Sequence, residues 1–190
     1  MKKNLLIALW FTLVTTVMFG VLYPLAITGL AQILFPGRAN GQLIERNGKI
    51  IGSRIIGQSF TAPGYFHSRP SSAGAGYDPT SSSGSNLGPT NKLLIERVKS
   101  DVQKLQSENP NVPIPVDLVT SSGSGLDPDI SPAAAEFQIP RVARARGMRE
   151  DDVRVLVAKH TFGRDLGFLG ELRVNVLELN LDLDALHPLR

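Results

Sequence analysis

The chain has 190 residues, no cysteine, and 20 Lys and Arg against 17 Asp and Glu, which gives a net charge of +3. Lys2 and Lys3 account for most of that excess, so the remainder is nearly neutral and lacks the basic balance of a nucleic-acid-binding protein. The absence of cysteine excludes disulfides and a thiol nucleophile.

The N-terminus predicts a membrane anchor over residues 1–37, with a transmembrane helix at about 5–30. No charged side chain occurs from Asn4 to Gly37, and Pro24 is the expected place for a bend. A cleaved signal peptide is the alternative, but the apolar run is longer than a signal core of about 7–15 residues. One face carries Thr12, Thr16 and Gly20 at a spacing of four, which would let a neighbouring helix approach closely, although such residues are also simply tolerated in membrane helices.

Residues 38–190 are expected to form a single soluble domain of mixed helix and strand, so the fold class is α+β with one transmembrane helix. Helix signals include Ser131 followed by Pro132, with a helix interrupted near Pro140 and ended by Gly147. The predicted elements are a strand at 49–58, a helix at 91–106, a short strand at 116–120, helices at 131–147 and 151–160, and a bulged strand at 172–183.

The segment 64–91 is too rich in Gly, Ser and Pro for regular structure, yet it carries aromatic, Arg and Asn side chains. This composition favours an ordered surface over a flexible spacer. The candidate partner contacts are Tyr65, Phe66, Arg69, Tyr77 and Asn86, with the alternative that the aromatic rings pack the loop onto its own domain.

An internal echo links the segment 82–89 to the segment 121–128, because both read S-S-G-S-x-L-x-P. The two segments are either spatial partners or two unrelated turns that precede helices.

Long stretches of the sequence resemble the C subunits of the bacterial Kdp potassium-transporting P-type ATPase. They are LYPLAITGLAQ, GSRIIGQSF, YFHSRPSSAGAGYDPTSSSGSNLGPTN, VPIPVDLVTSSGSGLDPDISPAAAEFQIPRVARARG and FGRDLGFLGELRVNVLELNLDLD. The resemblance implies a non-catalytic accessory subunit of an ATP-driven potassium uptake complex. Its partners would be a channel-like potassium-translocating subunit, an ATP-hydrolysing subunit and a small single-helix subunit.

The resemblance also implies a single-pass protein of the bacterial inner membrane, with a cytoplasmic N-terminus and an extracytoplasmic domain at 38–190. Charge counting alone does not settle that orientation, because Arg38, Arg46, Lys49 and Arg54 oppose the two N-terminal lysines. Family members are described as catalytic chaperones that raise the ATP affinity of the hydrolytic subunit. No firmly bound cofactor is expected, and ATP shared with that subunit is the one candidate ligand.

A nucleotide site would be unconventional, because the chain has no G-x-x-x-x-G-K-[ST] loop. The candidate nucleotide-binding residues are Ser121, Ser122, Gly123, Ser124 and Gly125, whose hydroxyl and backbone N–H groups suit a phosphate. Asp127 and Asp129 nearby would repel it, and an outer domain cannot reach cytoplasmic ATP. A cap or gate on the outer side of the channel-like subunit is the alternative mechanism.

A membrane-anchored hydrolase is the remaining function class. The sequence has no G-x-S-x-G, S-x-x-K or H-E-x-x-H motif, and its three histidines are scattered, so no metal site is expected. A catalytic set of Ser83, His160 and Asp127 could be assembled only by folding.

Overall fold

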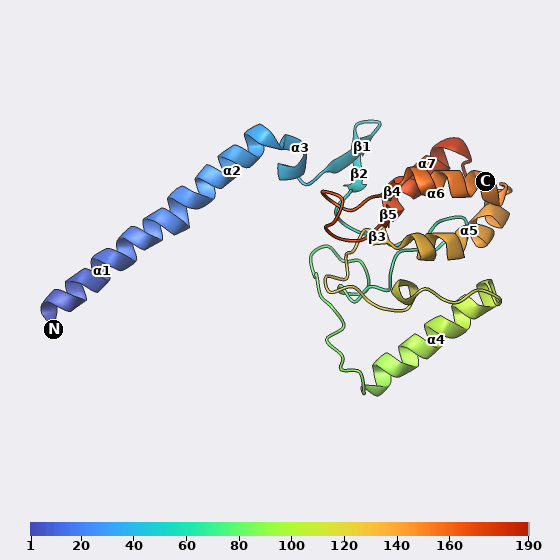
Figure 1. The fold of residues 1–190 in the computed structure, drawn as a ribbon, viewed down its shortest axis with the longest axis horizontal. Helices are drawn as coiled ribbons and strands as arrows, with labels where there is room; N and C mark the ends of the chain where they lie inside the picture. The colour runs from blue at the N-terminus through green and yellow to red at the C-terminus, as the bar shows by residue number, and fades with distance from the viewer. Residues whose placement is uncertain (190) are drawn as a thin grey trace. The chain divides into compact units, whose positions relative to one another are not determined.

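The computed structural model describes residues 1–189, and it divides into two compact units, Met1–Ile51 and Gly52 onward (Figure 1). The α+β class is confirmed: an apolar N-terminal helix is followed by a domain of mixed helices and short strands.

The first unit is dominated by one helical run, Lys2–Leu34, with a mean hydropathy of 2.3. It consists of α1 (Lys2–Val17), the π-helical turn η1 (Met18–Leu22) and α2 (Tyr23–Leu34), and a short helix α3 (Pro36–Ala39) follows. At about 1.5 Å per residue this run exceeds the roughly 30 Å of a bilayer core. Its length and composition therefore suit a membrane span.

A bend was predicted at Pro24, and the structure has instead the π-helical turn η1 just before it. Pro24 has no N–H to donate to the carbonyl of Gly20, and the amide of Tyr23 bonds to the carbonyl of Met18, one residue further back than in an α-helix. Figure 1 draws α1 and α2 as one continuous helix through this turn.

Strands β1 (Leu43–Arg46) and β2 (Lys49–Ser53) form a two-stranded sheet, and β2 crosses the boundary between the units. The second unit then contains α4 (Lys92–Glu108), the 3₁₀ turn η2 (Val116–Leu118), β3 (Asp129–Ile130), α5 (Pro132–Arg146), α6 (Glu150–Lys159), β4 (Thr161–Phe162), β5 (Arg173–Asn175) and α7 (Val176–Leu186).

Both ends of α5 follow the predicted signals, whereas the cap of α4 was not predicted. Ser131 accepts from the amide of Ala134 at the start of α5, and the Asn91 side chain accepts from the amide of Leu93 at the start of α4. Gly147 ends α5 with a left-handed φ of 64°, as a C-terminal glycine does.

Four expectations about secondary structure are wrong. The strand at 49–58 ends at Ser53, and the segment 116–120 forms η2 rather than a strand. Helix α5 runs through Pro140 without a break, so only the one hydrogen bond that this residue cannot donate is lost.

The largest difference lies at 172–183, where a three-residue strand gives way to helix α7. The Asn175 side chain accepts from the amide of Glu178 at 3.1 Å and caps the helix. The supposed slip in the strand pattern is therefore the change from a period of two to a helical period, which buries Val176, Leu179 and Leu183 on one face.

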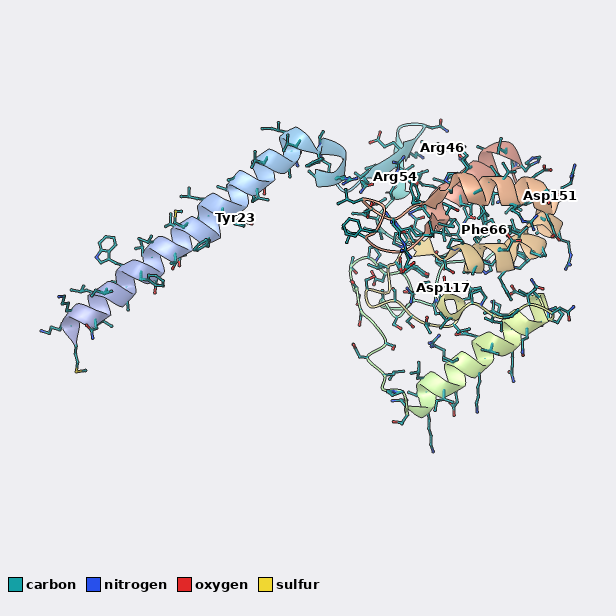
Figure 2. All side chains as sticks on the ribbon, in the orientation of Figure 1. Tyr23, Arg46, Arg54, Phe66, Asp117 and Asp151 are labelled. Atoms are coloured by element: carbon teal, nitrogen blue, oxygen red, sulfur yellow. The ribbon has the colours of Figure 1, made fainter. Side chains whose placement is uncertain are left out.

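The core of the second unit is formed by the antiparallel sheet β3-β5-β4 and by helices α5, α6 and α7. Asp129 pairs with Asn175 and Ile130 with Val174 across β3 and β5. The fully buried side chains are mostly aliphatic, and the largest are Phe66, Ile139, Leu179, Leu183, Val142, Val153, Val174 and Val176. Figure 2 shows Phe66, which belongs to the long loop, lying among these elements.

Candidate functional site

The loop 64–91 contains no helix or strand, yet its first residues are fixed in the core. The buried amide of Asn180 accepts from the N–H of Phe66 at 2.8 Å and donates to its carbonyl at 2.9 Å. Gln138 accepts from the N–H of His67 at 2.8 Å and donates to its carbonyl at 3.0 Å. Two side-chain amides thus take the place of a neighbouring strand.

Tyr65 is also held by its own domain. Its hydroxyl donates to Asp184 at 2.9 Å, and the guanidinium of Arg146 lies 4.9 Å from the ring centroid. Burial, reinforced by the hydrogen bond to Asp184, raises the pKa of the Tyr65 phenol. Phe66 is fully buried, so the structure supports the alternative for these two rings: they pack the loop onto its own domain.

Arg69 joins the loop to the segment that follows η2. Its Nη1 donates to the carboxylate of Asp127 at 3.0 Å, and its Nε and Nη2 reach the carbonyls of Thr120 and Ser121 at 3.4 Å. The guanidinium that was expected to meet another protein is therefore engaged within the chain.

Tyr77 turns the loop back on itself. Its φ of 57° is left-handed, its amide donates to the hydroxyl of Ser71 at 2.8 Å, and its phenol donates to the carbonyl of Arg69. Burial raises the pKa of the Tyr77 phenol. Asn86, by contrast, is exposed with a left-handed φ of 52°.

The two echoing segments are spatial partners, as one of the two interpretations predicts. Two groups of the first segment donate to the same carbonyl of the second. The N–H of Ser83 donates to the Ser124 carbonyl at 2.9 Å, and the hydroxyl of Ser82 donates to it at 3.0 Å. A Cβ on Gly125 would lie 2.6 Å from the carbonyl oxygen of Ser83. Only glycine permits this approach, so the two loops form one surface, here called the paired loops (residues 71–91 and 120–128).

Three of the candidate nucleotide-binding residues, Ser121, Ser122 and Ser124, already form side-chain hydrogen bonds within the paired loops. Ser122 is buried and its hydroxyl accepts from the amide of Gly125 at 2.9 Å. Ser124 Oγ accepts from the amide of Leu126 at 3.1 Å, and Ser121 Oγ accepts from Ser72 at 3.4 Å. Gly123 is exposed. Nucleotide binding by this segment stays a prediction.

A cavity of about 250 Å³ lies between the start of the loop and α4. His67, Ser68, Tyr77 and Lys104 contribute to its lining. Ligand pockets usually measure roughly 300–1,000 Å³, so this cavity is smaller than a nucleotide needs. Burial, with the nearby charge of Arg141, lowers the pKa of His67 below its ordinary 6.5.

The residues considered for a hydrolase do not meet. The hydroxyl of Ser83 donates to the carbonyl of Gly84, His160 Nε2 lies 2.8 Å from Asp182, and Asp127 binds Arg69. Each of the three side chains therefore bonds to a residue outside the set, and the structure does not assemble them into a catalytic site. Within residues 1–189, no group of three or more His, Cys, Asp or Glu side chains is placed to hold a metal ion.

The membrane-helix candidates lie on the exposed helical run of the first unit. A Cβ on Gly20 would lie 3.8 Å from the methyl carbon of Thr16, and Thr12 lies one turn before Thr16 on the same face. Contact of this face with another helix stays a prediction.

The fold and these contacts define a class: a protein with one candidate membrane span and an α+β domain built around a pair of hydrogen-bonded loops. The family model described as K+-transporting ATPase, c chain, matches residues 5–185. The chain belongs to this KdpC family.

Relatives named potassium-transporting ATPase KdpC subunit are similar over almost the whole chain. The protein of Koribacter versatilis is 64% identical over 189 residues, covering 100% of this chain and 98% of its own length. That of Caulobacter vibrioides is 59% identical over 91% of this chain and 88% of its own, and that of Rhodopseudomonas palustris strain BisB18 is 54% identical over 97% and 99%.

Proposed function

We propose that this chain is the accessory C subunit of an ATP-driven potassium uptake complex in the bacterial inner membrane. It performs no catalytic step itself and assembles with a channel-like potassium-translocating subunit, an ATP-hydrolysing subunit and a small single-helix subunit. Membership of the KdpC family supports the complex. One apolar helical run supports the membrane anchor.

The domain acts on the outer side, where the paired loops contact the channel-like subunit and stabilise it. The observation that carries this proposal is the direct bonding of the two loops through Ser82, Ser83 and Ser124. A surface fixed in this way loses little conformational entropy when a partner docks. Its exposed residues, which include Ser81, Asn86 and Gly123, are the ones available for that contact.

Assistance to ATP use by the hydrolytic subunit is the second candidate mechanism. The segment Ser121–Gly125 and the neighbouring guanidinium of Arg69 favour it, because a cation beside Ser and Gly groups suits a phosphate. The internal hydrogen bonds of Ser122 and Ser124 favour the contact surface instead.

The test places a bulky side chain on the paired loops. Ser81 is exposed, so Ser81→Trp leaves the core intact, and Ser100→Trp on the exposed face of α4 is the matched control. We expect Ser81→Trp to reduce both recovery of the other subunits in mild detergent and potassium-stimulated ATP hydrolysis. Ser100→Trp should leave both unchanged.

Other outcomes separate the candidates. If Ser81→Trp keeps the complex intact while the apparent affinity for ATP falls, the assistance mechanism replaces the contact surface. If the unaltered chain recovers no other subunit, the accessory-subunit function itself is refuted.

A further inference from the structure

The face of α4 that lines the cavity of about 250 Å³ is mostly charged. Asp101, Lys104, Leu105 and Glu108 recur at helical spacing and contribute to the lining together. A helix that packs on its own domain usually turns an apolar stripe inward. Helix α4 has no buried residue among its 17 residues. This part of α4 therefore borders a cavity instead of contributing to a core.

Another part of the lining comes from the start of the long loop. The hydroxyl oxygen of Ser68 is buried and forms no hydrogen bond with residues 1–189, although it lies beside the phenol of Tyr77. That phenol donates its own proton to the carbonyl of Arg69. A buried hydroxyl without a partner is unfavourable, so a molecule in the cavity that accepts its proton would stabilise the site.

The charges of the lining leave one cation over. The carboxylate of Asp101 accepts from Arg97 at 2.7 Å, and that of Glu108 lies 3.1 Å from Arg141. Within residues 1–189, Lys104 forms no ion pair and its side chain is exposed at the edge of the cavity. Both acidic groups are thus neutralised by arginines, and the lining still lacks one negative charge.

The remaining walls are largely apolar, with contributions from Phe60, Pro70, Leu105 and Leu118. The cavity could hold roughly eight water molecules at about 30 Å³ each, but water needs polar partners on several sides. Water alone would satisfy Ser68 and leave the apolar walls hydrated. A molecule with an anionic head and a short hydrocarbon part matches both halves of the lining.

We propose that this cavity binds a small organic monocarboxylate. The ammonium of Lys104 neutralises the carboxylate, the hydroxyl of Ser68 donates to it, and the hydrocarbon part lies against Leu105 and Leu118. The bound molecule joins α4 to the start of the long loop. This site goes beyond the proposed function and does not depend on it.

The three histidines of the chain provide the test. His67 lines the cavity, whereas His160 and His187 lie elsewhere and serve as internal controls. The ring resonances of all three are followed by NMR on the full chain in detergent, with butyrate as the probe. Butyramide is the control, because it has nearly the same shape without the charge. We expect a saturable shift at His67 with a Kd in the millimolar range for butyrate, and binding of butyramide that is about tenfold weaker or less.

The protonation of His67 gives a second readout. Burial lowers its pKa, the cations Arg141 and Lys104 lower it further, and the carbonyl of Ala62 and the carboxylate of Glu108 act in the opposite direction. An anion bound beside the imidazole favours the charged form. The pKa of His67 should therefore rise in the presence of butyrate and stay unchanged in butyramide.

Variants of the two binding side chains locate the carboxylate. Lys104→Gln removes the charge and keeps most of the stem, and Lys99→Gln at another exposed position of α4 is the matched control. We expect Lys104→Gln to weaken butyrate binding by about tenfold or more and Ser68→Ala by about threefold to tenfold, with no effect of Lys99→Gln. Since Ser68 has no partner in the protein, Ser68→Ala breaks no internal hydrogen bond.

Several results would overturn the proposal. If His67 shows no saturable shift, water fills the cavity; if butyramide binds as well as butyrate, or Lys104→Gln binds normally, the site does not recognise a carboxylate. Parallel shifts at His160 and His187 would mean a non-specific effect of the salt. Tighter binding of inorganic phosphate than of butyrate would assign the site to an inorganic anion, which also contradicts the proposal. None of these measurements involves the other subunits, so the accessory function is tested separately.

Discussion

The side chain of Asn180 forms two hydrogen bonds that hold the long loop against the core. The substitution Asn180→Ala tests how much these bonds contribute to stability. The substitution leaves the N–H and the carbonyl of Phe66 without partners in a site where both residues are at most 1% exposed. An unsatisfied buried polar group costs roughly 1–3 kcal/mol, so losing both bonds should cost about 2–6 kcal/mol. That is a large part of the roughly 5–15 kcal/mol that stabilises a typical domain.

Asn91→Ala is the matched control, because it removes the same side chain from an exposed helix N-cap. The Asn91 side chain accepts a single hydrogen bond, from the amide of Leu93, and its loss should cost about 1 kcal/mol. Denaturant unfolding of the full chain in detergent measures both free energies. Hydrogen exchange at residues 64–70 reports whether the loss is local to the loop.

The expected result is a greater loss for Asn180→Ala than for Asn91→Ala, with faster exchange at Phe66 and His67. If the two variants lose the same free energy, or if exchange at the loop is unchanged, side-chain amides do not hold the loop.

Two further predictions concern the same region. Gly125→Ala puts a Cβ 2.6 Å from the Ser83 carbonyl oxygen at a φ of +68°, and strain of this kind should lower the free energy of unfolding by about 1–3 kcal/mol. Gly123→Ala is the control, because nothing lies within 4 Å of its Cβ, and it should be almost neutral in the same unfolding assay. Equal effects of the two substitutions would contradict the close approach. The pKa of His67 is lowered from 6.5 by burial, so the unfolded chain binds the proton more tightly and stability falls as pH drops below 6.5. His67→Gln should flatten this dependence of the unfolding free energy on pH, and a slope that is unchanged in the variant would assign it to other groups.

Local chemistry made several elements predictable. The apolar run of the anchor and the helix ends at Ser131 and Gly147 are signals that a few neighbouring residues produce together. The echo between the serine loops left open whether the two segments pair or are unrelated turns. The structure has the pairing, and both segments use glycine where the backbones approach.

The missed features depend on contacts between distant residues. Helix α7 was mistaken for a strand because its first residues continue the alternation of β5, although Asn175 followed by Glu178 is a recognisable capping pattern. The burial of Phe66 depends on Asn180, which lies 114 residues further along the chain. A single sequence gives no signal for that partnership.

The exposed apolar side chains between β4 and β5, such as Leu166 and Phe168, were overlooked for a different reason. No element was predicted for residues 161–171, and only the exposed fractions of these side chains show that the core does not use them. Hydrophobic residues in a sequence indicate burial, but they do not say whether their own domain or another protein provides it.

The fully buried side chain of Arg146 has a consequence for the order in which the domain forms. It donates to the carbonyl of Gly64 at 2.5 Å, to Asp184 at 2.9 Å and to the carbonyl of His187 at 2.6 Å, so one guanidinium ties the entry of the long loop to the end of the chain. A ribosome releases these final residues last. The beginning of the loop therefore reaches its final position only after synthesis is complete, and extensions or truncations at the C-terminus act on a surface that lies more than a hundred residues earlier in the chain.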